Sequence, residues 1–155
     1  ISPPFHKIFQ FNKMTQSSIS RIVLFDGECI LCNKAAQFII NRDPNELFKF
    51  ASLQSNYGKQ LLNKMGNNSV ACNSIILIEG DKHFIKSAAV LKILRELRGY
   101  SFLYHILKLF PRIFLDSLYN FTAKTRYKIF GQTKHCAIYQ KSEFSNRVAN
   151  APENS

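Results

Sequence analysis

The 155-residue sequence has four cysteines, no tryptophan, ten acidic residues and no long uninterrupted apolar run. Four cysteines are too few for a disulfide-stapled scaffold of this length. The longest apolar stretch, near Tyr100–Leu118, is broken by Lys108, Pro111, Arg112 and Asp116. It therefore falls short of the ~20 apolar residues that a membrane-spanning helix needs. The N-terminus also lacks the continuous apolar core of a secretory signal. A hydrophobic content of 46% with 14 phenylalanines predicts one globular domain with a real core.

The scarcity of acids leaves a formal net charge of +11. Much of the excess lies late, since Asp81–Lys141 holds twelve Lys/Arg against three acids. Such an excess suits nucleic acid, an anionic membrane surface or acidic partners, but a solvated basic face is the interpretation that we favour. We expect no specific nucleic-acid partner, and we keep peripheral membrane contact through the basic C-terminal helices as a candidate.

The most informative stretch is Arg21–Asn41, in which a short apolar run is followed by Asp26-Gly27 and then by two cysteines. The β-branched run predicts a buried strand and Asp-Gly predicts a turn. From about Leu31 the apolar residues adopt helical spacing. Cys29 and Cys32 therefore lie at a strand–turn–helix junction, the usual architecture of a dithiol redox centre.

The position of these cysteines has a chemical reason. A cysteine reacts as its thiolate, which the free amides and dipole of a helix N-terminus stabilise. Cys29 precedes the first helical turn, and Cys32 lies close enough to form a disulfide with it or to resolve a mixed disulfide. Asp26 has two candidate roles: it relays a proton to or from the second thiol, or it caps the turn.

Further elements follow in alternating order. We expect strands at 48–51, 74–79 and 83–85, and helices at 57–65 and 87–97, with Ser87 as the cap of the latter. Gly80-Asp81 is a hairpin turn signal. The predicted fold class is α/β, a thioredoxin-like β-α-β-α-β-β-α core over residues 21–99.

The remaining chain surrounds this core. Two helices, 102–110 and 113–123, predict a C-terminal helical extension that forms a cap within the same domain over residues 100–136, followed by a polar tail at 137–155. Residues 1–20 read as a flexible leader, with Met14 as a candidate start. We expect a cytoplasmic location, or an organellar one if residues 1–20 are a transit-peptide remnant.

Several segments together resemble one family. Asp26-Gly27-Glu28-Cys29-Ile30-Leu31-Cys32-Asn33 is similar to the signature of the DCC family of thiol-disulfide oxidoreductases, named for D-x-x-C-x-x-C. Four further segments match in the same order: Phe50–Ser55, Ser74–Glu79, Ser87–Leu91 and Ala123–Gly131 with Cys136 shortly after.

The resemblance implies a thioredoxin-like fold and dithiol chemistry with Asp26, Cys29 and Cys32 as the active motif. It adds Arg126, Tyr127 and Cys136 as candidate auxiliary residues. The sequence departs from the pattern at Tyr139, where the family often has proline. The loop Asn67–Asn73 also lacks the proline that thioredoxins place before the corresponding strand.

Two hypotheses of different classes remain. In the first, the protein is a thiol-disulfide oxidoreductase without a bound cofactor: Cys29 is the nucleophile, since the N-terminal thiol of such motifs is usually exposed, and Cys32 resolves the mixed disulfide. Its partners are protein or small-molecule thiols and disulfides.

In the second hypothesis, the protein is a basic module that binds a membrane surface or polyanion. Its CxxC is then structural, or holds zinc with help from Cys72, Cys136, His83 or His135. We expect no metal site. Cys72 reads as a loop cysteine, and Cys136 as a third redox thiol or a buried structural one.

Overall fold

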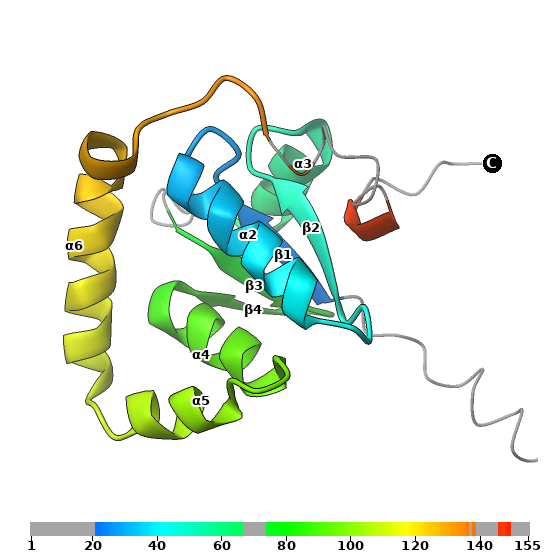
Figure 1. Cartoon of the computed structure of the whole chain (residues 1–155). Coiled ribbons are helices and arrows are strands. Elements are labelled where there is room, and N and C mark those ends of the chain that lie inside the picture. The colour runs from blue at the N-terminus through cyan, green and yellow to red at the C-terminus, as the bar shows by residue number, and fades with distance from the viewer. Residues whose placement is uncertain (1–20, 67–73, 137, 139–145, 150–155) are drawn as a thin grey trace, which may run out of the picture.

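The computed structural model describes residues 21–66, 74–136, 138 and 146–149 (Figure 1). The leader, the loop around Cys72 and position 139 lie outside these residues. The described elements are the strands β1 (Arg21–Phe25), β2 (Phe48–Ser52), β3 (Ile76–Glu79) and β4 (Lys82–Ile85), and the helices α2 (Ile30–Arg42), α3 (Asn56–Lys64), α4 (Lys86–Glu96), α5 (Ser101–Lys108) and α6 (Arg112–Phe130).

The strands form one sheet in the order β2-β1-β3-β4. β1 pairs in parallel with β2, with Val23 opposite Phe50, and antiparallel with β3, with Val23 opposite Leu77. β4 returns antiparallel along β3 through the predicted Gly80-Asp81 turn. This β-α-β-α-β-β-α order confirms the predicted thioredoxin-like fold with its C-terminal helical extension.

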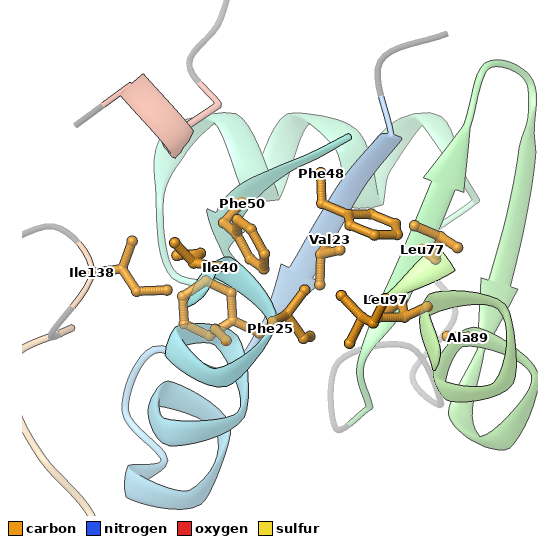
Figure 2. Close-up of a cluster of buried hydrophobic side chains, with 12 residues drawn as sticks. Val23, Phe25, Ile40, Phe48, Phe50, Leu77, Ala89, Leu97 and Ile138 are labelled. Atoms are coloured by element: carbon orange, nitrogen blue, oxygen red, sulfur yellow. The ribbon is translucent and has the colours of Figure 1, made fainter. Parts of the chain in front are cut away.

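The two faces of the sheet carry separate apolar clusters, because alternate side chains of a strand point to opposite faces. Val23 and Phe25 of β1 pack with residues of α2 and α4 (Figure 2). Ile22 and Leu24 pack on the opposite face, where Leu62 of α3 joins them. α2 is thereby fixed against the sheet with its first residue beside the end of β1.

The C-terminal extension packs on the core, because α6 lies against α4 and α2 (Figure 1). α6 continues to Phe130, seven residues beyond the predicted end at Ala123. The continuation brings Arg126 into the protein interior, where its side chain is buried. No described helix is long and apolar enough to cross a membrane.

Two other expectations need correction or completion. Ser87 does not cap α4, whose N-cap is Ile85 without a side-chain bond; instead, the Ser87 hydroxyl donates to the Asp116 carboxylate of α6. Residues 146–149 of the expected polar tail lie along β2, where the Ala149 N–H donates to the Phe50 carbonyl at 2.8 Å. Arg147 there forms a buried ion pair with Asp43.

Candidate active site

Cys29 occupies the N-cap of α2, as the sequence predicts. Its backbone is extended (φ −91°, ψ 120°), and its Sγ accepts a hydrogen bond from the Cys32 backbone N–H at 3.4 Å. The sulfur thus satisfies one of the free amides of the first turn and lies at the positive end of the helix dipole. Gly27 in the preceding turn has no room for a side chain, since a Cβ there would lie 2.5 Å from Ser52 Oγ.

Cys32 lies within the first turn of α2 and is half-buried. Burial, the hydrogen bond between its side chain and Cys29, and the charge of Cys29 together raise the pKa of Cys32 to about 12. The guanidinium of Arg126 opposes this rise, and its Nη1 lies 3.4 Å from Cys32 Sγ. Cys32 therefore keeps its proton at neutral pH while Cys29 lies beside it.

Asp26 is buried and accepts four hydrogen bonds. Oδ1 accepts the Glu28 backbone N–H at 3.0 Å and Gln54 Nε2 at 2.8 Å. Oδ2 accepts Arg126 Nη2 at 3.0 Å and the Tyr127 hydroxyl. The bond from Glu28 shows that Asp26 caps the turn, and the others join this turn to Gln54, just after β2, and to α6.

Arg126 connects the carboxylate to the dithiol, because one guanidinium contacts both Asp26 and Cys32. Both partners of the Arg126–Asp26 ion pair are 4% exposed. Burial, the hydrogen bond to Asp26 and the Asp26 charge raise the pKa of Tyr127 to about 12. The structure thus brings together five of the six predicted site residues: Asp26, Cys29, Cys32, Arg126 and Tyr127.

Cys136, the sixth residue, lies at the edge of this group. Its Sγ is 3.3 Å from Asn33 Oδ1, and its partly buried side chain packs against the core. The buried Asn33 amide also donates to the Gly27 carbonyl at 2.7 Å and to the Cys29 carbonyl at 3.1 Å. Cys136 therefore belongs to the shell that holds the Cys29 turn in place.

Sequence reasoning assigned no role to Asn33 or Gln54, although both belong to segments that resemble the DCC family. Gln54 Oε1 accepts the Gly27 backbone N–H at 3.0 Å while its amide donates to Asp26. Only the positions of Asn33 and Gln54 in those segments could have indicated a role in the site, because polar side chains are common in turns.

The expectation that Cys29 is the exposed thiol is wrong for this structure. Cys29 is fully buried. The chain that follows α6 runs past the N-terminal end of α2 (Figure 1). Gln132 forms an isolated β-bridge with Cys29, and the Thr133 N–H donates to the Glu28 carbonyl at 2.8 Å. We call residues Gly131–Cys136 the cover segment.

Cys32 instead faces a cavity of about 140 Å³ between α2, α4 and α6. The cavity walls are mainly apolar, with Asp26, Cys32 and Arg126 as the polar groups. Its apolar lining consists of Phe25, Leu31, Ala35, Ala36, Ile75, Val90, Tyr119 and Ala123, with Thr122 beside them. A sulfur-containing group with an apolar neighbour fits the chemistry of this lining.

Among the described residues, no three His, Cys, Asp or Glu side chains gather to hold a metal ion. Cys72, one of the ligands considered for a zinc site, lies outside them. No disulfide joins the described cysteines, Cys29, Cys32 and Cys136, to one another.

The sheet order, together with a CxxC motif at the start of the first core helix, defines a thioredoxin-like dithiol protein. The chain belongs to the DCC family, since the DCC1-like thiol-disulfide oxidoreductase family matches residues 23–132. It is 44% identical over 126 residues to the uncharacterized protein YuxK of Bacillus subtilis (strain 168), covering 81% of this chain and 92% of that protein. It is 38% identical over 118 residues to a chloroplastic DCC family protein of Arabidopsis thaliana, covering 76% of this chain and 69% of that protein. No solved structure matches the chain.

Proposed function

We propose that the protein is a thiol-disulfide oxidoreductase in which Cys29 is the nucleophile and Cys32 the resolving thiol. The observation that carries the proposal is the N-cap position of Cys29, whose sulfur accepts the Cys32 backbone N–H. A helix N-terminus stabilises a thiolate at this position. The raised pKa of Cys32 supports the same order of attack, because the second thiol keeps its proton until the first has reacted.

The exchange proceeds in two displacements. The Cys29 thiolate attacks one sulfur of a substrate disulfide, forms a mixed disulfide and releases the other substrate sulfur as a thiolate. Cys32 then loses its proton and attacks Cys29 Sγ, which forms the Cys29–Cys32 disulfide and releases the second substrate thiolate. Two electrons pass from the dithiol to the substrate, and the reverse sequence oxidises a substrate dithiol.

Asp26 and Arg126 assist the second displacement. Arg126 Nη1 lies at Cys32 Sγ, so its charge stabilises the thiolate that forms there. Asp26 holds the guanidinium in place and, as the carboxylate on the other side of this guanidinium, receives the proton from Cys32. Tyr127 fixes the same carboxylate from α6.

Access to Cys29 requires the cover segment to move, because the Gln132 bridge and the Thr133 hydrogen bond close the turn. Cys32 itself lines the apolar cavity. The proposed partners are protein or small-molecule thiols and disulfides, and the redox-active Cys29–Cys32 disulfide itself takes the place of a cofactor.

Trapping of the mixed disulfide tests the order of attack. The reduced Cys32→Ser and Cys29→Ser variants are mixed with an aromatic disulfide such as dithiobis(nitrobenzoate), and adducts are mapped by peptide mass spectrometry. We expect a stable adduct on Cys29 in Cys32→Ser and a much slower reaction of Cys32 in Cys29→Ser. A faster adduct on Cys32 would reverse the assigned roles.

The Cys136→Ser variant is the control for the two motif variants. It keeps both motif thiols and should retain the exchange activity of the natural chain. The natural chain itself tests the alternative hypothesis of a basic binding module. If the natural chain itself shows no exchange, and only salt-sensitive binding is measured, the dithiol is structural and the oxidoreductase proposal fails.

We also propose a reducing compartment as the site of action, because a CxxC motif between a strand and a helix in a chain with only four cysteines is typical of redox chemistry there. This is the cytoplasm, or an organelle if residues 1–20 are a transit-peptide remnant. Localisation of the full-length protein fused to a C-terminal fluorescent tag distinguishes the two, and a location outside both would contradict the assignment.

A further inference from the structure

The described surface has its large exposed apolar side chains on one part of the molecule. All of them lie on α5, on α6 and on the connection between these helices; the most exposed are Leu109 (85%) and Ile113 (82%). The others are Phe102, Ile106, Phe110, Phe114, Leu118, Phe121, Ile129 and Phe130. Single exposed apolar residues are ordinary on a protein surface, whereas a contiguous group of this kind marks an interaction surface.

The residue spacing collects these side chains into stripes. On α5, Phe102 and Ile106 are four residues apart and share a face. On α6, Phe114, Leu118 and Phe121 follow the i, i+4, i+7 pattern of one helical face. We call these two stripes, Ile113 at the start of α6 and the connection between the helices the apolar ridge.

The ridge is separate from the surface that packs on the core. α6 buries Leu115 and Arg126 on its inner side. The α5–α6 corner lies at the edge of the molecule, away from β2 (Figure 1). Phe110 and Phe114 stack there with ring centroids 5.6 Å apart, so the corner presents a continuous apolar surface.

Positive charge accompanies the ridge. Four exposed cations lie on α5, α6 and their connection: Lys108, Arg112, Lys124 and Lys128. The same helices contain one acid, Asp116, which accepts a hydrogen bond from Ser87 of α4. A second copy docked through this face would place like charges opposite one another, whereas an anionic surface would neutralise them.

We propose that the apolar ridge docks the protein on the surface of an anionic phospholipid membrane. The apolar side chains enter the boundary between headgroups and acyl chains, and the lysines and arginine meet the phosphates. The helices lie in the plane of the interface. Because the inner side of α6 carries Arg126, docking places the dithiol about 10 Å, one helix diameter, from the lipid.

Vesicle co-sedimentation of the reduced full chain tests the proposal. The probes are vesicles of phosphatidylglycerol and phosphatidylcholine in equal amounts, and vesicles of phosphatidylcholine alone. We expect stronger binding to the anionic vesicles, and a loss of more than about tenfold in partitioning for the L109D/I113D double variant. These two side chains are the most exposed in the ridge, so the fold should tolerate the change.

A matched control separates the effect of losing apolar side chains of the ridge from the effect of adding negative charge. The Q60D/N63D variant makes the same charge change at two exposed positions of α3 and should keep most of the binding. The K124Q/K128Q variant should lose about fivefold per lysine on anionic vesicles, equivalent to about 1 kcal/mol for each basic residue. On phosphatidylcholine alone it should match the natural chain.

Three outcomes would overturn the proposal. The first is no binding of the natural chain to anionic vesicles, and the second is equal losses in L109D/I113D and Q60D/N63D. The third is concentration-dependent self-association that L109D/I113D abolishes while no vesicle binding is seen, since this would assign the ridge to a second copy. Disulfide exchange with dithiobis(nitrobenzoate), measured without lipid, should be unchanged in L109D/I113D, so the docking and exchange proposals can fail independently.

Discussion

Cys29 and Cys32 have different environments although they are separated by only two residues. Cys29 Sγ accepts an amide hydrogen bond and is fully buried, whereas Cys32 faces a cavity beside Arg126. Burial is the largest cause of the raised pKa of Cys32. The hydrogen bond to Cys29 and the charge of Cys29 raise it further. Part of the rise in the pKa of Cys32 therefore comes from Cys29, and removing the Cys29 sulfur measures that part.

Replacing Cys29 by alanine should lower the pKa of Cys32. The substitution removes the hydrogen bond and the charge, both of which raise that pKa, and leaves the burial. At pH 9, alkylation of Cys32 by iodoacetamide should therefore accelerate, by about tenfold for each unit that the pKa falls. Peptide mass spectrometry measures the rate at Cys32, with Cys136→Ala as the control. An unchanged or slower rate in Cys29→Ala would show that burial alone sets this pKa.

Asp26 and Arg126 form the second pair to test. Replacing Asp26 by alanine leaves the buried guanidinium without its carboxylate, which should cost about 3–5 kcal/mol of stability. Urea denaturation of the reduced protein measures the loss. The Tyr127→Phe variant removes one donor to the same carboxylate and keeps the ion pair, so it should lose less, about 1.5–3 kcal/mol, the usual value of a hydrogen bond to a charged group. If Asp26→Ala loses no more stability than Tyr127→Phe, the ion pair does not make the large contribution to stability that we expect.

At the scale of elements, the cover segment connects α6 to the dithiol. It begins at Gly131, whose backbone (φ 82°, ψ 178°) is a conformation that other residues rarely adopt. A Cβ there would be 3.5 Å from Ile30 Cδ1, an ordinary contact, so backbone strain is the main cost of a side chain. A substitution at Gly131, where the cover segment begins, should therefore affect the burial of Cys29.

The Gly131→Ala variant should open the cover segment. We expect faster alkylation of Cys29 and a loss of about 1–3 kcal/mol of stability from the strained backbone. Gly99→Ala is the matched control, since Gly99 also has a positive φ (83°) and lies in the α4–α5 connection with nothing within 4 Å of an added Cβ. It should lose stability without a change at Cys29. Equal Cys29 rates in the two variants would mean that Gly131 does not set access to that sulfur.

The elements nearest the dithiol were the most predictable from sequence. β1, the turn and α2 follow from hydrophobic spacing within Arg21–Asn41, and Cys29 forms the expected N-cap. The site contacts from α6 span about a hundred residues, since Arg126 and Tyr127 meet Asp26 across the chain. No local pattern encodes such contacts, and only the resemblance to the DCC family pointed to these two residues. The burial of Cys29 was missed because the cover segment has no periodic signal.

At the scale of the whole molecule, the protonated groups around the dithiol link stability to pH. The pKa of Cys32 rises from 9.0, and that of Tyr127 from 10.0, each to about 12. A group whose pKa is higher in the folded state contributes stability below its unfolded pKa and loses it as pH rises toward the folded value. The reduced protein should therefore lose stability as pH rises from 9 to 12.

Urea denaturation of the reduced chain across this pH range measures the effect. The Cys32→Ala/Tyr127→Phe double variant lacks both groups, so its stability should fall less steeply than that of the natural chain. The comparison matters because other residues also titrate at high pH in both proteins. Parallel curves for the two proteins would contradict the assigned pKa directions.

The central claim is that Cys29 and Cys32 form a working redox pair, and a redox titration tests it most directly. The full chain is equilibrated in glutathione buffers of graded potential, and mass spectrometry after alkylation follows each thiol separately, with metal content measured in parallel. We expect one two-electron transition in which Cys29 and Cys32 oxidise together while Cys136 stays reduced. Thiols that hold a metal ion and resist both oxidation and alkylation would contradict it.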